Sequence, residues 1–552
     1  MAPLKHGDRE LPLAAGRTLF DYADDLRMRV PTSCRRNGDC HECIVEVRQG
    51  AQALSPLSPA ESFLRGNYRL ACQAAVVDSD AIVEFNILRR QPRILTESVR
   101  REFRLDPLTV RRGDDVVWMG ASEPVRVDSY TGAMYGLAVD LGTTTVVMHL
   151  ADMETGKLVY TASFENPQRF GGSDIMHRIS YDGGEYRGEL KQVVHSSVNF
   201  EIGDMVRRLG IRRRQIFEMV VVGNSTMRDL FFGIDVQSIG EKPYRSVIEQ
   251  EMLDGKRTTT ALSVSAGDLG IRIHPKANVY GGPLIGSHVG ADIAADLLAV
   301  GMDLEEEPVV LVDVGTNTEV VAGNRHRLLA ASCPAGPAFE GGAVTYGMPG
   351  YDGAVESLRL AGDRIEYRTI GDREPQGICG SGLIDLLAEL RRTGKMSELG
   401  VLANGARQFE FVPGKGITLS RADISALAQA KSANYCGQQI VLRRYGLPAS
   451  GFRRLYLAGG FANYVDIDNA VAIGFIANVP RDRILKVGNA SLEGATVMLL
   501  SGELRRKAEE MARRVQHVEL ETEPDFFDLF VEGCHFKPMF AGADRGGADR
   551  RG

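Results

Sequence analysis

Two similar stretches decide the fold: GLAVDLGTTT at residues 136–145 and LVDVGTNTE at residues 311–319, 173 residues further along. Each is an apolar, strand-like run that ends in Asp-x-Gly-Thr. From Tyr135 onward such runs alternate with helical stretches, which is typical of α/β architecture. A single repeat over this distance predicts a duplicated domain, because solenoid repeats have periods of only about 20 to 50 residues.

The two stretches carry residues that suit a bound polyphosphate. Gly142 lets the backbone approach a phosphate closely, and successive N–H groups can cradle its oxygens. Asp140 would repel phosphate but can hold a hydrated Mg²⁺ ion, and Asp313 repeats it. We therefore expect two opposed hairpins to grip one polyphosphate. The predicted contacts are Gly142, Thr143, Thr144 and Thr145 in the first hairpin and Gly315, Thr316, Asn317 and Thr318 in the second.

A third element, LYLAGGFAN at residues 455–463, ends a strand in two glycines, against which a ring or a ribose can pack. We predict contacts to the nucleoside from Gly459, Gly460 and Phe461. Two more glycine-containing turns fit as lining of the same cleft, and they contribute Asn224, Gly380, Ser381 and Gly382. Lys431 lies on a predicted helix, about residues 423–445, where it either flanks the base or belongs to a solvated helix face.

The order of these elements, two phosphate motifs and then an adenosine motif, resembles the superfamily of actin, sugar kinases and heat-shock chaperone ATPases. This resemblance implies a duplicated actin-like, ribonuclease H-like ATPase domain that binds ATP and Mg²⁺. Asp140 and Asp313 would then be catalytic residues. Glu319 is a candidate for orienting water, and its position suits a structural hairpin residue equally well.

Four of the eight cysteines fall within 39 residues, spaced Cys34-x5-Cys40-x2-Cys43-x28-Cys72. Plant-type ferredoxins bind iron–sulfur clusters with three close cysteines and one distant one, and a first gap of five residues resembles the adrenodoxin-like branch. Gly38 lies in this loop, where a chain that wraps a cluster needs unusual backbone angles. Residues 1–88 therefore look like a 2Fe–2S ferredoxin domain with an α+β, β-grasp fold. The alternative is a structural zinc site, which usually needs a second short cysteine pair.

The remaining sequence sets the domain boundaries and excludes some functions. We expect an Arg-rich linker over residues 89–134, two ATPase halves over residues 135–307 and 308–540, and a disordered tail over residues 541–552. The net charge of −7 argues against binding to nucleic acid or to an anionic membrane. Neither a signal peptide nor a membrane-length apolar run is found, so we expect a cytoplasmic protein.

The combination of both domains is similar to the family of reductive activators of corrinoid proteins. This resemblance implies ATP-dependent, one-electron reduction of Co(II) to Co(I) in a corrinoid protein of a methyltransferase system. The cluster on Cys34, Cys40, Cys43 and Cys72 would donate the electron, after an upstream low-potential donor has reduced it. Ser332, placed in a loop after the second hairpin, is a candidate for approaching cobalt; otherwise it is a turn hydroxyl that satisfies the local backbone. The oligomeric state is left open, and a homodimer is one option.

Two other functions remain. The chain could be an ATP-driven donor to another low-potential acceptor, like the activators of hydroxyacyl-CoA dehydratases, but those hold a 4Fe–4S cluster between two subunits. It could also be a non-enzymatic, nucleotide-gated redox sensor. A sugar or acetate kinase would leave the four N-terminal cysteines unexplained.

Overall fold

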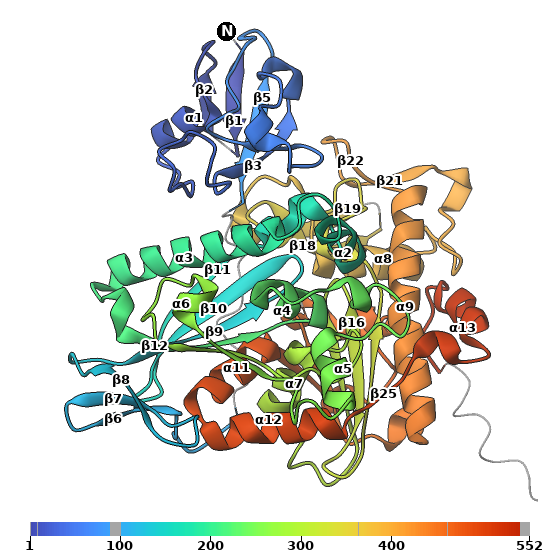
Figure 1. The fold of residues 1–552 in the computed structure, drawn as a ribbon. Helices are drawn as coiled ribbons and strands as arrows, with labels where there is room; N and C mark the ends of the chain where they lie inside the picture. The colour runs from blue at the N-terminus through green and yellow to red at the C-terminus, as the bar shows by residue number, and fades with distance from the viewer. Residues whose placement is uncertain (1, 8, 89–100, 363, 461, 541–552) are drawn as a thin grey trace, which may run out of the picture. The chain divides into compact units, whose positions relative to one another are not determined.

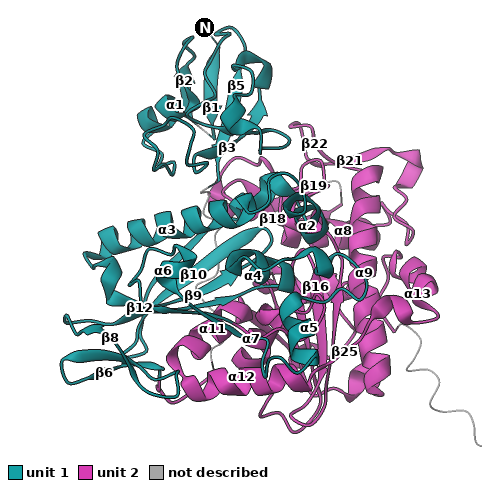
Figure 2. Ribbon diagram, viewed as in Figure 1, with its two compact units in different colours: residues 1–91, 107–281 teal, residues 92–106, 282–552 magenta. Residues whose placement is uncertain are grey.

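The structure is a computed structural model that describes residues 2–7, 9–88, 101–362, 364–460 and 462–540. The chain divides into two compact units (Figure 2). The first contains residues 1–91 and 107–281, and the second contains residues 92–106 and 282–552. The predicted tail and the beginning of the predicted linker lie outside the described residues. None of the described helices combines the length and the apolar character that a membrane crossing requires.

The first unit begins with the predicted β-grasp domain (Figure 1). Its sheet has the order β2-β1-β5-β3-β4, in which β1 and β5 run parallel and the other neighbours run antiparallel. Helix α1 is set by a capping box between Thr18 and Asp21 and buries Leu19, Phe20 and Tyr22. The elements are β1 (Pro3–His6), β2 (Arg9–Pro12), α1 (Leu19–Asp25), β3 (Ile44–Gln49), β4 (Tyr68–Leu70) and β5 (Val83–Ile87).

The segment interpreted as a linker contains a three-stranded antiparallel sheet, β6-β7-β8. Its strands are β6 (Thr109–Arg112), β7 (Asp115–Trp118) and β8 (Val125–Ser129). Val116 and Val127 are buried, and the Thr109 hydroxyl donates to the buried carboxyl of Glu218, 2.7 Å away. The sheet therefore has a small core of its own, contrary to our expectation of a segment with little core.

The rest of the first unit is built on a six-stranded sheet of order β11-β10-β9-β12-β14-β13. Strands β9, β10 and β11 form an antiparallel meander, and β12 and then β14 continue in parallel with β9. The strands are β9 (Tyr135–Leu141), β10 (Thr145–Asp152), β11 (Leu158–Glu165), β12 (Ile216–Val222), β13 (Leu262–Ser265) and β14 (Asn278–Gly281). The helices are α2 (Ile175–Asp182), α3 (Glu189–Leu209), α4 (Ser225–Phe232), α5 (Val247–Leu253) and α6 (Ala266–Leu269).

The second unit repeats this plan in a sheet of order β24-β23-β15-β16-β17-β25. Strands β15, β16 and β17 form the meander, and β23 and then β24 continue in parallel with β15. The strands are β15 (Val309–Val314), β16 (Thr318–Gly323), β17 (Leu328–Cys333), β23 (Leu455–Ala458), β24 (Ile484–Gly488) and β25 (Gln516–His517). The predicted duplication is therefore present in both the order and the direction of five strands.

Helices and small sheets complete the second unit. Gly494 of α11 lies where an added Cβ would be 2.0 Å from the Ala295 carbonyl oxygen of α7, so the two helices cross with their backbones in close approach. The helices are α7 (Ala291–Ala299), α8 (Gly380–Arg392), α9 (Arg421–Tyr445), α10 (Ile467–Ala472), α11 (Ala490–Leu500), α12 (Gly502–Arg514) and α13 (Phe526–Gly533). The small sheets are β18 (Ala354–Ala361), β19 (Arg364–Thr369) and β20 (Gly377–Ile378), and β21 (Gln408–Val412) with β22 (Ile417–Ser420).

Candidate functional site

The cysteine loop has the backbone that the sequence predicts. Gly38 adopts φ +97°, and an added Cβ would lie 2.9 Å from the Ala60 Cβ. Arg35, Arg36 and His41 also have positive φ values, which are uncommon for residues with a side chain. The loop is thus coiled so that backbone groups turn toward its cysteines.

The four thiols lie as two hydrogen-bonded pairs. The Sγ atoms of Cys43 and Cys72 are 3.4 Å apart, and this hydrogen bond lowers the pKa of Cys72 to about 6. Burial raises the pKa of Cys34, but hydrogen bonds from Cys40 and from backbone N–H groups, including that of Gly38, outweigh it and bring the pKa to about 7. One sulfur of each pair is therefore set up as a thiolate, which is the form that binds metal.

Among the described residues, no group of three or more His, Cys, Asp or Glu side chains is arranged to hold a metal ion. The donor set nevertheless fits a 2Fe–2S cluster, because such a cluster takes four cysteine thiolates and all four belong to this small domain. Cys333, Cys379 and Cys436 are buried in the second unit.

The turn of the first hairpin, between β9 and β10, is held by its carbonyl groups. The Asn166 side chain donates to the Gly142 oxygen at 2.8 Å, and the Asn166 backbone N–H donates to the Thr144 oxygen at 2.8 Å. The buried guanidinium of Arg178, on α2, donates to the Thr143 oxygen at 2.6 Å. Three successive carbonyls of one turn are thereby fixed.

This anchoring decides where the turn directs its N–H groups. In a trans peptide the C=O and N–H bonds of one plane point in opposite directions. The N–H groups of Thr143 and Thr144 therefore point away from Asn166 and Arg178, as an anion-binding turn requires. Asn224, predicted to line the site, caps α4 and donates from Nδ2 to the Thr143 hydroxyl at 3.1 Å.

The second hairpin, between β15 and β16, has a turn that is one residue shorter. Val314 pairs with Thr318, whereas in the first hairpin Leu141 pairs with Val146. In this register Glu319 lies opposite Asp313, and Val147 lies opposite Asp140. Only the second hairpin thus places a carboxyl across from its aspartate.

Ser332 lies in strand β17, directly opposite Glu319, and not in the predicted loop. Its hydroxyl donates to the Glu319 carboxylate at 2.9 Å. The prediction of a loop was wrong because the run Leu328–Cys333 continues the meander as a third strand. The hydroxyl satisfies a side chain, not the local backbone that we considered as the alternative.

Acidic side chains surround the second hairpin. Burial raises the pKa of Asp313 to about 6, with the nearby charge of Glu340 as a further cause. Burial and the charges of Asp292 and Asp313 raise the pKa of Glu319 well above its ordinary range. Asp296, fully buried on α7, accepts from the Ser491 hydroxyl at 2.8 Å, and burial also raises its pKa. Perturbed carboxyls of this kind are typical of functional sites.

A glycine supports each hairpin from the neighbouring parallel strand. An added Cβ on Gly223 would lie 2.6 Å from the Leu141 oxygen, and one on Gly459 would lie 2.2 Å from the Val314 oxygen. Leu141 and Val314 each follow the aspartate of their hairpin. Gly459 of the predicted adenosine motif is thus required by close backbone packing. Gly460 is exposed with open space around it, and Phe461 lies outside the described residues.

Lys431 and the Gly380–Gly382 turn are committed to the packing of the second unit. Lys431 lies on α9 as predicted, but it is fully buried, and its ammonium donates to the carbonyls of Gly533 and His535. The alternative of a solvated helix face is therefore wrong, and the ammonium is engaged with the C-terminal segment. Ser381, at the start of α8, donates to the Glu356 carbonyl at 2.7 Å.

Sequence reasoning missed the residues that hold the hairpins. Asn166, Arg178, Asp296 and Glu340 lie 17 or more residues from their partners in the predicted motifs. The Thr316 hydroxyl, for example, donates to Glu340. The only local signal is the Asn166-Pro-Gln turn at the end of an apolar strand, which marks a loop without stating what it contacts.

Comparison with known proteins agrees with this architecture. Three family models match: the 2Fe-2S iron-sulfur cluster binding domain over residues 5–77, the RACo middle region over residues 135–305, and the C-terminal ASKHA domain of RACo over residues 307–541. The corrinoid activation enzyme RamQ of Eubacterium limosum is 32% identical over 429 residues, which are 73% of this chain and 70% of that protein.

Two further proteins extend the comparison. The [Co(II) methylated amine-specific corrinoid protein] reductase of Methanosarcina barkeri is 24% identical over 72% of this chain and 76% of its own. A solved structure of a reductive activator for corrinoid,iron-sulfur protein has a TM-score of 0.71 at 29% identity, covering 97% of this chain and 98% of that one. On these matches, the chain belongs to the RACo family of corrinoid-protein activators.

Proposed function

We propose that this protein uses ATP to drive one electron onto the cobalt of a corrinoid protein and so converts Co(II) to Co(I). The observation that carries the proposal is the presence, in one chain, of a four-cysteine ferredoxin domain and a duplicated pair of Asp-x-Gly-Thr hairpins. Relatives named as a corrinoid activation enzyme and as a Co(II) corrinoid protein reductase support the choice of acceptor.

The proposed reaction combines the transfer of one electron with the hydrolysis of ATP. A low-potential electron carrier upstream is oxidised by one electron, Co(II) is reduced by one electron, and ATP and water give ADP and phosphate. When bound, a 2Fe–2S cluster accepts and donates single electrons, at about −400 mV in plant-type ferredoxins. Each 100 mV of shortfall against the acceptor costs about 2.3 kcal/mol. ATP can offset this cost only by interacting differently with two states of the protein.

The residues have distinct tasks in this proposal. The N–H groups of the two hairpin turns receive the phosphates, and Asp140 and Asp313 hold the hydrated Mg²⁺ ion. Glu319 orients the attacking water, and Ser332 fixes the Glu319 carboxylate through the 2.9 Å hydrogen bond. This assigns Ser332 a positioning role and replaces our earlier assignment of this residue to cobalt.

The remaining predicted contacts belong to the same proposal. The backbone at Gly459 and Gly460, with Phe461, receives the nucleoside, and the Asn224 amide orients the Thr143 hydroxyl. We place the reaction in the cytoplasm, and a homodimer is one assembly compatible with it.

The test mixes the cluster-loaded protein anaerobically with a Co(II) corrinoid protein and a chemical reductant, and follows cobalt absorbance with and without Mg-ATP. We expect Co(I) only when ATP is present. Cys72→Ser should abolish Co(I) formation, whereas the matched Cys534→Ser, a half-buried cysteine outside the ferredoxin domain, should not. ATP turnover that responds to another acceptor, with several corrinoid proteins left unreduced, would favour a dehydratase-activator-like donor. ATP binding without any acceptor-stimulated turnover would favour a sensor.

A further inference from the structure

Within the first unit, the cysteine loop of the ferredoxin domain is in contact with the first half of the ATPase domain. His41, next to Cys40, is hydrogen-bonded to Glu189 at the start of α3, with 3.0 Å between Nδ1 and the carboxylate. The His41 ring stacks on Phe63 with centroids 4.1 Å apart. Arg29 pairs with the buried Asp204 further along α3 and lies over the Phe200 ring.

Helix α2 reaches both this contact and the first hairpin. The buried Tyr181 donates from its hydroxyl to the Phe63 carbonyl at 2.6 Å, and Arg65 lies over its ring. Arg178, three residues earlier, donates to the Thr143 carbonyl of the hairpin. Residues three apart lie on the same face of a helix. One turn of α2 therefore makes one hydrogen bond to the first hairpin and one to the ferredoxin domain.

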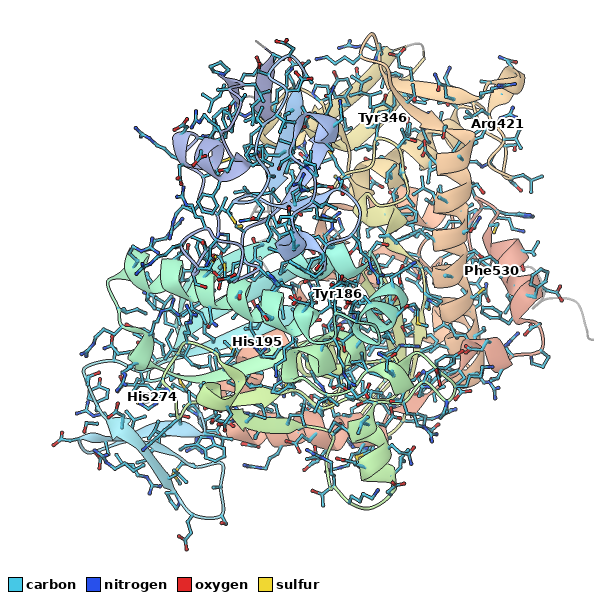
Figure 3. The ribbon with its side chains drawn as sticks, turned by 45° about the horizontal axis from the view of Figure 1, so that its top comes forward. Tyr186, His195, His274, Tyr346, Arg421 and Phe530 are labelled. Carbon is cyan, nitrogen blue, oxygen red and sulfur yellow. The ribbon has the colours of Figure 1, made fainter. Side chains whose placement is uncertain are left out.

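Aromatic packing makes this connection continuous. The Phe170 ring meets Phe63 edge-on at 5.3 Å and Tyr181 at 5.5 Å. Tyr186, which is labelled in Figure 3, stacks on Tyr181 with the ring centroids 6.1 Å apart. A displacement of the hairpin therefore reaches the ferredoxin domain through groups in direct contact, because packed side chains transmit strain and do not absorb it.

The contact between the two domains is not fully packed. A cleft lies along it, lined by Val30 and Ile87 from the ferredoxin domain and by Phe164 and Val193 from the ATPase half. A void costs the dispersion contacts that dense packing would supply, so the docked arrangement is bound less tightly than a domain core. This is the property expected of a contact that opens and closes.

We propose that α2 couples the first phosphate hairpin to docking of the ferredoxin domain, with Arg178 and Tyr181 as positioning residues, and that ATP favours the released domain. The proposal rests on the proposed function: the docked cysteine loop is engaged by α3, and handing an electron to a partner protein requires that loop to be accessible. Binding of phosphate at the turn shifts Thr143, Arg178 follows its carbonyl, and the Tyr181 bond to Phe63 is lost.

Coupling between ATP binding and docking of the ferredoxin domain is reciprocal, so the direction of the expected change in ATP affinity is determined. If ATP favours release, variants that weaken docking must bind ATP more tightly. We expect Tyr181→Phe and Glu189→Ala to lower the ATP Kd about fivefold or more, the lower end of typical couplings, measured by calorimetry on cluster-loaded protein. Tyr130→Phe is the matched control, because it removes one hydroxyl contact, to Glu154, elsewhere in the same unit and should leave the Kd unchanged.

Arg178→Lys tests the connection itself. In that background Glu189→Ala should change the ATP Kd by less than about twofold. Release of iron to a chelator provides a second readout: ATP should accelerate it in the wild-type protein and should have little further effect in Tyr181→Phe. If Arg178→Lys does not fold, the coupling is still tested by the ATP Kd of Tyr181→Phe and Glu189→Ala and by the chelator assay.

Two results would overturn the inference. One is an ATP Kd in both docking variants equal to that of the wild type, with iron release independent of ATP; if the same wild-type protein still makes Co(I) with ATP, only the coupling fails. The other is a wild-type protein that binds no ATP, which would overturn the proposed function as well.

Discussion

The two Asp-x-Gly-Thr hairpins share one backbone plan and differ in the groups around them. Both follow an apolar strand, both carry Asp-x-Gly-Thr, and each is supported by a glycine packed on the carbonyl after the aspartate. The first is held by neutral and cationic donors, namely Asn166 and Arg178. The second is surrounded by carboxyls with raised pKa values.

The difference suggests a division of labour after duplication. A turn whose carbonyls are hydrogen-bonded to Asn166 and Arg178 directs its N–H groups away from these two residues, which suits phosphate binding, and a movement of the turn is passed on to both of them. A buried carboxyl opposite the aspartate, present only as Glu319, suits the orientation of water. The corresponding position in the first hairpin is Val147, which cannot take part in proton transfer.

The largest effect should come from removing this asymmetric carboxyl. Glu319→Gln keeps the shape and the hydrogen bond to Ser332 but removes the ionisable carboxyl that orients water, so we expect ATP turnover to fall by about 10²-fold or more with ATP affinity within about threefold. Val147→Ala, at the matching position of the first hairpin, should leave turnover within a few-fold. Phosphate release and calorimetry measure the two quantities. Equal losses in both variants would abolish the distinction between the hairpins.

The supporting glycines test what the hairpins have in common. Gly459→Ala adds a Cβ 2.2 Å from a carbonyl oxygen at φ +111°, and we expect it to destabilise the second unit by about 2–3 kcal/mol. Gly223→Ala, with its contact of 2.6 Å, should be less severe. Gly460→Ala meets open space and is the control. Thermal melting gives the order of stability of the three variants. An unaffected Gly459→Ala protein would show that the backbones at Gly459 and Val314 are not in close approach.

The pH dependence of stability should separate the two hairpins as well. The pKa of Glu319 is raised in the folded protein, so the folded state keeps a proton that the unfolded chain loses above about pH 4.3. Folding stability therefore decreases as pH rises through that range. Glu319→Gln should become more stable relative to wild type as pH rises above about 4.3. A stability difference independent of pH would mean that Glu319 is already ionised in the folded state.

The smallest effects should come from the turn hydroxyls. Thr316→Val removes the bond to Glu340, and Thr143→Val removes the acceptor of Asn224. Each should cost about 1 kcal/mol of stability, the usual worth of one hydrogen bond. Because Thr316 faces a carboxylate, its loss should exceed that of Thr143. Denaturant titration measures both, and the reverse order would contradict the picture of a charged second hairpin.

Much of this arrangement is readable from the sequence because it depends on local chemistry. Apolar runs that end in Asp-x-Gly predict both hairpins, and the spacing of Cys34 to Cys72 predicts the ferredoxin domain. Gly38 was expected at a position of unusual backbone, and it has a positive φ value.

The rest depends on contacts that are distant in sequence. The bond from Arg178 to Thr143 joins residues 35 positions apart, and nothing local marks either as a partner. The relative lengths of the two turns follow from strand register, which the repeated motif hides. Ser332 was assigned to a loop but lies in β17, where the small residues Ala330 and Ala331 weaken the strand pattern. Lys431 is buried through pairing with carbonyls of the C-terminal segment, a tertiary contact that overrides its ordinary exposure.

The coupling of ATP hydrolysis to cobalt reduction can be tested by measuring Co(I) and released phosphate in the same anaerobic sample, for the wild-type protein and for Glu319→Gln, with the cluster content of each determined by iron analysis. We expect the wild-type protein to form Co(I) only with Mg-ATP and to release phosphate as it does so. We expect Glu319→Gln, equally loaded with cluster, to lose both together. Co(I) formation at the wild-type rate by Glu319→Gln, or by the wild-type protein without ATP, would contradict the proposed function.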